Sequence, residues 1–222
     1  MADLDKLFES IVAGKLEPAL EVTNQIIAEQ IDIQSVINNY MIKAMEEIGD
    51  RFQKNEAYVP ELLMAARAMK GALDLLKPHM KDRNSAVIGK VVIGTVFGDL
   101  HDIGKNLVAS MFEGCGFEVI NLGVNVPNGK FIEAVKREKP DILCLSALLT
   151  TTMTNMKGVI EALEKEGLRN EVKVMVGGAP VNELFAAQIG ADGYSGNANA
   201  AVLKAKELLY SCLLYTSDAA DE

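Results

Sequence analysis

An alternation of apolar, β-rich runs with helical stretches, beginning near residue 89, constrains the fold of this chain more than any other feature. The runs read KVVIGTV, FEVINLG, DILCLSA, VKVMVGG and the short ADGYS. Helical patterns follow them at residues 104–115, 128–138, 153–166, 181–189 and 197–210. Such alternation predicts a doubly wound parallel sheet of five strands with helices on its faces. In open sheets of this kind, ligands bind at the carboxyl ends of the strands.

Residues 1–80 show only helical signals. Apolar residues recur at intervals of three and four in two stripes, which are Ile37, Tyr40, Met41, Ala44, Met45, Ile48 and Phe52, and then Val59, Leu62, Leu63, Ala66, Met69, Leu73 and Leu76. Gly14, the pair Ile31–Asp32 and the polar QKNEA divide this part into four segments. The pattern predicts a small helical bundle.

The predicted domain limits follow from these patterns. The helical bundle covers residues 1–80, a linker covers 81–88, and a flavodoxin/Rossmann-like α/β domain covers 89–210. The stretch KPHMKDRNSA, residues 77–86, is polar and contains a proline, so it is also the predicted hinge, and His79 within it is expected to be solvated. The tail 211–222 neither extends the preceding apolar stripe nor adds a needed strand, so we expect it to be frayed or foreign.

Composition narrows the classes of partner and the compartment. The net charge of -9 at pH 7 argues against binding to a nucleic acid backbone. The start of the chain lacks a secretory signal, and no apolar run approaches the ~20 residues that span a bilayer. We therefore expect a cytoplasmic protein with no membrane partner. Cys115, Cys144 and Cys212 are scattered, which indicates neither disulfides nor a zinc site, and the first two are predicted to be buried fillers.

Three short motifs coincide with predicted strand ends. Asp99, His101 and Gly104 follow the first strand in GDLHDIGKN, Ser146 and Leu148 follow the third, and the pair Gly177–Gly178 closes the fourth. There are 41 residues between Gly104 and Ser146, and 28 between Leu148 and Gly177. A neutral imidazole is a good ligand for a transition metal, and a carboxylate bonded to its other nitrogen fixes the tautomer. Asp99 and His101 have the right spacing for such a pair.

Each motif alone has a simpler structural explanation. A single histidine after a strand is more often a structural or surface residue than a ligand. The glycine pair alone fits a turn, and the threonines in SALLTTT alone fit a helix cap. The combination and its spacing make the set specific.

Together, the motifs DxHxxG, SxL and GG resemble the signature of cobalamin-binding domains. The helical stretch AYVPELLMAARAMKGALDLL is similar to the cap of methionine synthase and of the corrinoid proteins in methanol, methylamine and methoxyl methyltransferase systems. The resemblance covers residues 1 to about 210.

The resemblance implies a site. His101 would replace the dimethylbenzimidazole of a cobalamin or related corrinoid as the lower cobalt ligand, with Asp99 behind it and Thr152 supplying the hydroxyl of a relay. Family members carry a hydroxyl at this last position, and threonine keeps it while adding a methyl group. The other implied cofactor-binding residues surround the histidine or line a slot for the displaced nucleotide tail. They are Gly98, Asp102, Ile103, Gly104, Ser146, Leu148, Thr150, Gly177 and Gly178.

Apolar residues of the cap have two possible roles. Tyr58, Leu62, Leu63, Met64 and Met69 either fill the interior of the bundle, which is the usual case, or cover the reactive face of the corrin. By resemblance to methionine synthase, residues near Tyr58, Leu63 and Met64 would shield a cobalt-bound methyl group from water.

The function implied is that of a methyl carrier, cycling between cobalt(I) and methylcobalt(III) and turning nothing over alone. Its partners would be a substrate-specific methyltransferase, a second methyltransferase that passes the methyl group to tetrahydrofolate or a thiol, and a reductive activase. The donor remains open among methanol, a methylamine, a methylated betaine and an aryl methyl ether.

Three alternatives use parts of the same pattern. The B12-binding subunit of an adenosylcobalamin mutase shares DxHxxG, but the helical cap disfavours it. A B12-dependent sensor would need a DNA-reading element, and we expect none in this acidic chain. A signalling domain without a cofactor would leave Asp99, His101, Ser146 and the glycines unexplained.

Overall fold

The computed structural model describes residues 2–80 and 88–217, and side chains up to Tyr210. By internal contacts the chain divides into two compact units, one formed by the chain up to residue 88 with residues 110–117, the other by residues 89–109 and those from 118 onward. No helix of the described residues is long and apolar enough to cross a membrane.

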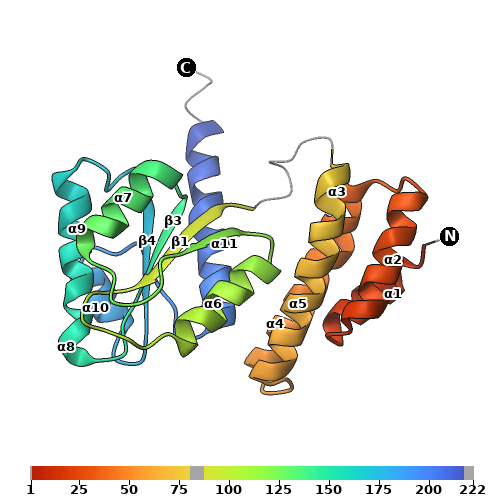
Figure 1. Ribbon diagram of the computed structural model, residues 1–222, viewed down its shortest axis with the longest axis horizontal. Coiled ribbons are helices and arrows are strands. Elements are labelled where there is room, and N and C mark those ends of the chain that lie inside the picture. Colours follow the sequence, from red (N-terminus) through yellow and green to blue (C-terminus); the bar gives the residue numbers. More distant parts are fainter. Residues whose placement is uncertain (1, 81–87, 218–222) are drawn as a thin grey trace. The chain divides into compact units, whose positions relative to one another are not determined.

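The first unit is helical, as predicted (Figure 1). Its elements are α1 (Leu4–Val12), α2 (Leu16–Ala28), α3 (Ile33–Val36), the π-helical turn η1 (Ile37–Met41), α4 (Ile42–Gln53), α5 (Val59–Leu76) and the 3-10 turn η2 (Lys77–His79). Because α3, η1 and α4 follow one another without a break, the unit has the four predicted segments. His79 is exposed, as expected.

Local chemistry sets the ends of these helices. Asp3 and Asp32 cap α1 and α3 by accepting hydrogen bonds from backbone N–H groups in the first turn. Gly14 lies in the connection between α1 and α2, where its φ is +65°. A Cβ added there would lie 2.5 Å from the Cβ of Met64. Glycine therefore allows the α1–α2 connection to approach α5 closely.

The second unit contains five parallel strands, in the order β2-β1-β3-β4-β5. They are β1 (Lys90–Thr95), β2 (Glu118–Asn121), β3 (Ile142–Ser146), β4 (Lys173–Gly177) and β5 (Gly193–Tyr194). Each lies inside one of the predicted runs. The predicted doubly wound sheet is confirmed.

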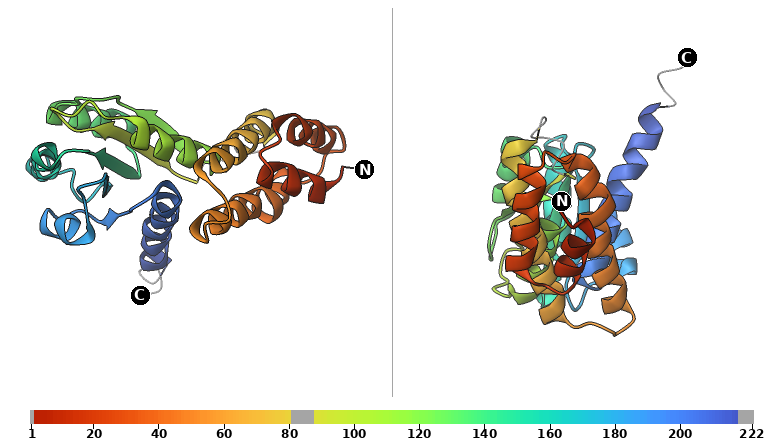
Figure 2. Two further views of the ribbon diagram at one scale, coloured as in Figure 1. Left: turned by 90° about the horizontal axis from the view of Figure 1, so that it is seen from below. Right: turned by 90° about the vertical axis from the view of Figure 1, so that its right-hand side faces the viewer.

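Helices lie on both faces of this sheet (Figures 1 and 2). They are α6 (Ile103–Gly114), α7 (Asn128–Glu138), α8 (Thr150–Met153), α9 (Asn155–Lys165), α10 (Glu183–Gln188) and α11 (Ala198–Ser217). On the α7, α9 and α10 side, one apolar cluster joins Phe131, Val159 and Ala186 to Leu143 and Val174 of the central strands. Cys115 and Cys144 are buried, as predicted.

The strand register places the predicted site at one edge of the sheet. Thr95, Ser146 and Gly177 pair side by side at the carboxyl ends of β1, β3 and β4. Loops that leave these strands therefore begin at the same level. This brings together motifs that lie far apart in the sequence.

Two boundaries differ from expectation or lie beyond the described residues. The last helix was expected to end at residue 210, but the backbone of α11 remains helical to Ser217. Whether residues 211–222 are foreign stays a prediction, as do the domain limits. Residues 81–87 of the predicted linker 81–88, and with them most of the predicted hinge 77–86, lie outside the described residues.

Candidate functional site

Asp99 is the centre of the site at the strand ends. Its side chain is fully buried, and both carboxylate oxygens accept hydrogen bonds. Oδ1 accepts from Nδ1 of His101 at 2.8 Å and from the backbone N–H of His101 at 3.0 Å. Oδ2 accepts from the hydroxyl of Thr152 at 2.6 Å and from the backbone N–H of Leu148 at 2.8 Å. The DxHxxG motif, the SxL motif and the predicted hydroxyl of Thr152 thus meet on one carboxylate.

These hydrogen bonds decide the charge of Asp99. Burial alone would raise its pKa, but the bonds from Thr152, His101 and Leu148 outweigh burial and hold the pKa of Asp99 well below its usual range. The group is therefore a carboxylate at neutral pH and can only accept. The proton of the bond to His101 must then sit on Nδ1, so Nε2 is the ring nitrogen that can act as a metal ligand.

The imidazole ring of His101 is fixed through Nδ1 and is also accessible to solvent. Its side chain is 50 % exposed although Asp99 behind it is completely buried. The donor set is therefore one outward imidazole nitrogen whose tautomer is fixed by a carboxylate, and this fits an axial ligand of a cobalt corrinoid.

Three hydrogen bonds with asparagines hold the loop that carries His101. The backbone N–H of Gly98, a residue with φ of +81°, donates to Oδ1 of Asn125 at 2.8 Å. Asn125 returns a backbone N–H to the carbonyl of Asp99 at 2.9 Å. The amide of Asn155 donates to the carbonyl of Phe97 at 2.7 Å. Loop residues 97–99 are thereby fixed by asparagines from two other segments.

The three predicted slot glycines have different surroundings. An added Cβ on Gly178, whose φ is +131°, would lie 1.8 Å from the carbonyl oxygen of Ala147, so no other residue fits there. A Cβ on Gly177 would make ordinary contact with Ser195. A Cβ on Gly104 would meet no protein atom within 4 Å. The space beside Gly104 is thus open, which suits the close approach of a ligand.

The other predicted residues of this unit lie around the same strand ends. Ile103 is 89 % exposed at the start of α6, and Leu148 is also exposed. Thr150 is exposed at the start of α8, and Ser146 is half-buried at the end of β3. The carboxylate of Asp102 accepts a hydrogen bond from the side-chain amide of Asn106.

The cap residues separate into two groups. Leu62 and Met69 are buried in the bundle, so the core interpretation holds for them. Tyr58, Leu63 and Met64 are exposed, and for them the core interpretation is wrong. The reason is the helical period, because the buried face of α5 is already filled by residues such as Ala65 and Met69. These three side chains remain available to cover a ligand.

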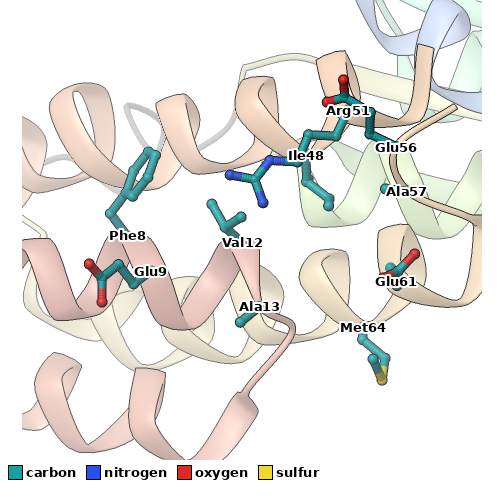
Figure 3. Close-up of a pocket in the computed structure, with 10 residues that line it drawn as sticks. All are labelled: Phe8, Glu9, Val12, Ala13, Ile48, Arg51, Glu56, Ala57, Glu61 and Met64. Carbon is teal, nitrogen blue, oxygen red and sulfur yellow. The ribbon is translucent and has the colours of Figure 1, made fainter. Parts of the chain in front are cut away.

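The bundle itself contains a cavity of about 380 Å³. Its walls come from α1, α4, the α4–α5 connection and the start of α5, as Figure 3 shows. The lining residues are Phe8, Glu9, Val12, Ala13, Ile48, Arg51, Glu56, Ala57, Glu61 and Met64. Of the predicted cap residues, Met64 belongs to this lining.

Sequence reasoning missed the residues that hold the histidine loop. Asn125 and Asn155 lie outside every motif, and so does Thr95, whose hydroxyl donates to the carbonyl of His101 at 3.0 Å. The sequence did carry one signal, which is an asparagine in the turn VNVPNG. In the structure this residue, Asn125, adopts φ of +52°. Asparagine is enriched in that conformation, so a turn with a side chain turned back on the backbone was foreseeable there.

Comparison with known proteins agrees with this geometry. Residues 89–203 and residues 3–77 each match a family described as a B12 binding domain. The trimethylamine corrinoid protein of Methanosarcina barkeri is 44% identical over 206 residues, which are 92% of this chain and 95% of that protein. The dimethylamine corrinoid protein of the same organism is 43% identical over 93% of this chain and 97% of its own. The chain belongs to the methyl-carrying corrinoid protein family.

Solved structures extend the match to three dimensions. A cobalamin-binding protein from Desulfitobacterium hafniense superimposes with a TM-score of 0.79 at 35% identity, covering 94% of this chain and 99% of that chain. A chain of the methanol:cobalamin methyltransferase complex of Methanosarcina barkeri gives 0.80 at 27% identity, covering 95% and 79%. The predicted family and fold are confirmed, and the cofactor of this protein is a corrinoid.

Proposed function

We propose that this protein carries a methyl group on a corrinoid whose cobalt is held from below by Nε2 of His101. The observation that carries the proposal is the 2.8 Å bond between Nδ1 of His101 and the buried carboxylate of Asp99. It fixes the tautomer and leaves the other ring nitrogen outward. When bound, the corrinoid supplies the chemistry of accepting and releasing the methyl group.

Around this ligand, the other residues of the chain bind and orient. The hydroxyl of Thr152 holds Oδ2 of Asp99, so Oδ1 of the same carboxylate stays on Nδ1 of the imidazole. The residues proposed to line the cofactor and its displaced tail are Gly98, Asp102, Ile103, Gly104, Ser146, Leu148, Thr150, Gly177 and Gly178. Support comes from their common position at the carboxyl ends of β1, β3 and β4.

In the helical unit, Tyr58, Leu63 and Met64 are proposed to exclude water from the reactive side of the corrin. All three are apolar or aromatic, lie within the first turns of α5 and are exposed. Isolated exposed apolar residues need no explanation, but several together within two helical turns suit a surface that a ligand covers.

The partners follow from the family and the names of its members. A methyltransferase specific for a methylated amine would load the corrinoid, since the relatives above are corrinoid proteins for trimethylamine and dimethylamine. A second methyltransferase would pass the methyl group to tetrahydrofolate or a thiol, and a reductive activase would restore the reduced cofactor.

Electron paramagnetic resonance of the cobalt(II) form tests the ligation directly. The protein would be labelled with nitrogen-15 histidine and reconstituted with hydroxocobalamin. A histidine ligand changes the triplet nitrogen splitting into a doublet, whereas benzimidazole from the cofactor leaves a triplet. We expect the doublet in the unsubstituted protein and its loss in His101→Ala.

His79→Ala is the matched control, since His79 is exposed in η2 and is the other histidine of the chain. It should keep the doublet. A triplet in the labelled protein, or a doublet that survives in His101→Ala, would refute ligation by His101.

A further inference from the structure

Lys105 occupies an unfavourable place for a cation. It lies in the first turn of α6 and is 4 % exposed. The amino end of a helix carries partial positive charge, and burial removes water from the ammonium group. Both effects act against a lysine at this position. Burial accordingly lowers the pKa of Lys105, and the carboxylate of Asp102 partly opposes that shift.

Its ammonium group joins two uncharged amides from different elements. Nζ donates to Oδ1 of Asn106 at 2.6 Å and to Oδ1 of Asn121 at 2.8 Å. The amide of Asn121 also donates to Oδ1 of Asn106 at 3.1 Å. Lys105 thus ties the first turn of α6 to the carboxyl end of β2.

Two chains of hydrogen bonds lead from this cluster to the peptide that follows His101. In the first, the amide of Asn106 donates to Oδ2 of Asp102 at 2.9 Å, and its backbone N–H donates to the carbonyl of Asp102 at 2.7 Å. Asp102 is the neighbour of His101 in the chain. The residue that follows His101 is therefore held as well.

The second chain passes through the backbone. Oδ1 of Asn121 accepts from the N–H of Gly123 at 3.0 Å, and the carbonyl of Gly123 accepts from the N–H of Thr95 at 3.0 Å. The hydroxyl of Thr95 then donates to the carbonyl of His101 at 3.0 Å. Both chains therefore end on the backbone of His101 and Asp102.

We propose that Lys105 is a positioning residue, which holds the His101–Asp102 peptide so that the imidazole keeps a single orientation. It acts through Asn106 and Asn121 and does not itself touch cofactor or substrate. A buried cation that joins two amides allows few alternative arrangements of these groups, so it favours one conformation. The importance of that orientation rests on the proposed role of His101 as cobalt ligand.

Lys105→Met removes the charge and keeps an unbranched apolar chain. Replacing a residue that holds a metal ligand in place costs about tenfold or more in metal affinity or activity. We therefore expect about a tenfold lower ratio of histidine-bound to unbound cobalt(II), measured from the nitrogen-15 doublet. Lys136→Met, at an exposed lysine paired with Glu166, is the matched control and should leave the ratio unchanged.

A measurement without cofactor separates positioning from ligation. In nitrogen-15 histidine spectra of the cofactor-free protein, the His101 ring should give one set of signals, and Lys105→Met should broaden it or add a second set. If the unsubstituted holoprotein lacks the doublet, ligation by His101 fails, and these spectra still decide on Lys105. One unchanged set of His101 signals in a folded Lys105→Met protein would overturn the positioning role.

Asn106→Ala provides a second route if Lys105→Met does not fold. Asn106 is exposed, and Asn106→Ala removes its side-chain bonds with Asp102, Lys105 and Asn121 but leaves the second chain, from Asn121 through Gly123 and Thr95, in place. The same broadening of the His101 signals is expected. Sharp, unchanged signals would contradict the proposal.

Discussion

The loop after β1 and the first turns of α5 both present apolar side chains to solvent, yet they are built differently. Leu100 in the loop is 71% exposed and Tyr58 at α5 is 69% exposed. The loop has no regular structure of its own, and side chains from other segments fix it. The start of α5 is an ordinary helix end, where the carboxylate of Glu61 accepts the backbone N–H of Tyr58 at 2.7 Å.

This difference teaches where precision comes from. In the loop, polar side chains hold one another and the backbone in place through hydrogen bonds. Replacing one of them should therefore alter the position of His101. At α5, the backbone is stable locally, so an exposed side chain can change without moving its neighbours. We therefore expect large effects around the strand ends and small ones at α5.

The largest effect is expected for Gly178→Ala. Its φ of +131° and the approach of the Ala147 carbonyl leave no room for a Cβ, so we expect a loss of about 3 kcal/mol or more in the free energy of unfolding. Gly167→Ala is the control, because Gly167 has φ of +71° with nothing within 4 Å, and should cost about 1 kcal/mol. Urea unfolding of both variants measures the difference, and equal losses would show that backbone conformation alone matters.

Asp99→Asn should come next. The amide cannot match the charge-assisted bonds from Thr152 and His101, so we expect about 2 kcal/mol less stability at neutral pH. Because the folded pKa lies below the ordinary value of about 3.9, this stabilisation is fully present above that pH and is lost as the pH falls toward the folded pKa. Unfolding curves at several pH values should show the two proteins converging only in strong acid; convergence near pH 6 would contradict the low pKa.

Gly104→Ala sharpens the comparison, because it separates the fold from the ligand. The added methyl group meets no protein atom, and alanine favours a helix, so the cofactor-free protein should be as stable or up to about 1 kcal/mol more stable. If Gly104 lies against the cofactor, the affinity for hydroxocobalamin should nevertheless fall. Thermal unfolding and a binding titration measure the two quantities, and unchanged affinity would remove Gly104 from the site.

A smaller effect on stability is expected for Tyr58→Ala and Met64→Ala. Both side chains are exposed, so unfolding should change by less than about 0.5 kcal/mol. If they exclude water from the reduced corrin, its reoxidation should nevertheless be faster in these variants, as followed by absorbance. Leu62→Ala, at a fully buried neighbour, should instead cost about 2 kcal/mol or more.

The smallest effect is expected for deletion of residues 211–222. These residues were predicted to be frayed or foreign to the domain, so the melting temperature should not change. A marked drop would show that the part of α11 beyond Tyr210 belongs to the folded unit.

How far the sequence reached depends on the kind of interaction. The strands and the four helical segments were predictable, because the hydrophobic period is a local property. The meeting of Asp99, His101 and Thr152 was implied by the resemblance to cobalamin-binding domains. The roles of Asn125 and Lys105 were not. Each depends on hydrogen bonds between segments that touch only after the sheet forms, and neither residue type is distinctive in the sequence.

The cap residues show that even a local pattern does not predict which side chains are buried. Helical period predicts which residues share a face, but Leu62 and Leu63 differ by one position and end in opposite environments. Only the packing of α5 within its bundle decides which face is buried. The end of α11 was missed for a related reason, because a helix can continue after its apolar stripe stops.

The exposed apolar residues that follow the strand ends should also affect how the protein behaves during purification. The side chains concerned are all exposed, and they are Phe97, Leu100, Ile103, Leu148 and Leu149. Exposed apolar side chains in such numbers make proteins adhere to one another and to hydrophobic resins. Preparations lacking the corrinoid should therefore be retained on a phenyl column and precipitate earlier with ammonium sulfate than loaded ones, which offers a simple way to sort the two forms.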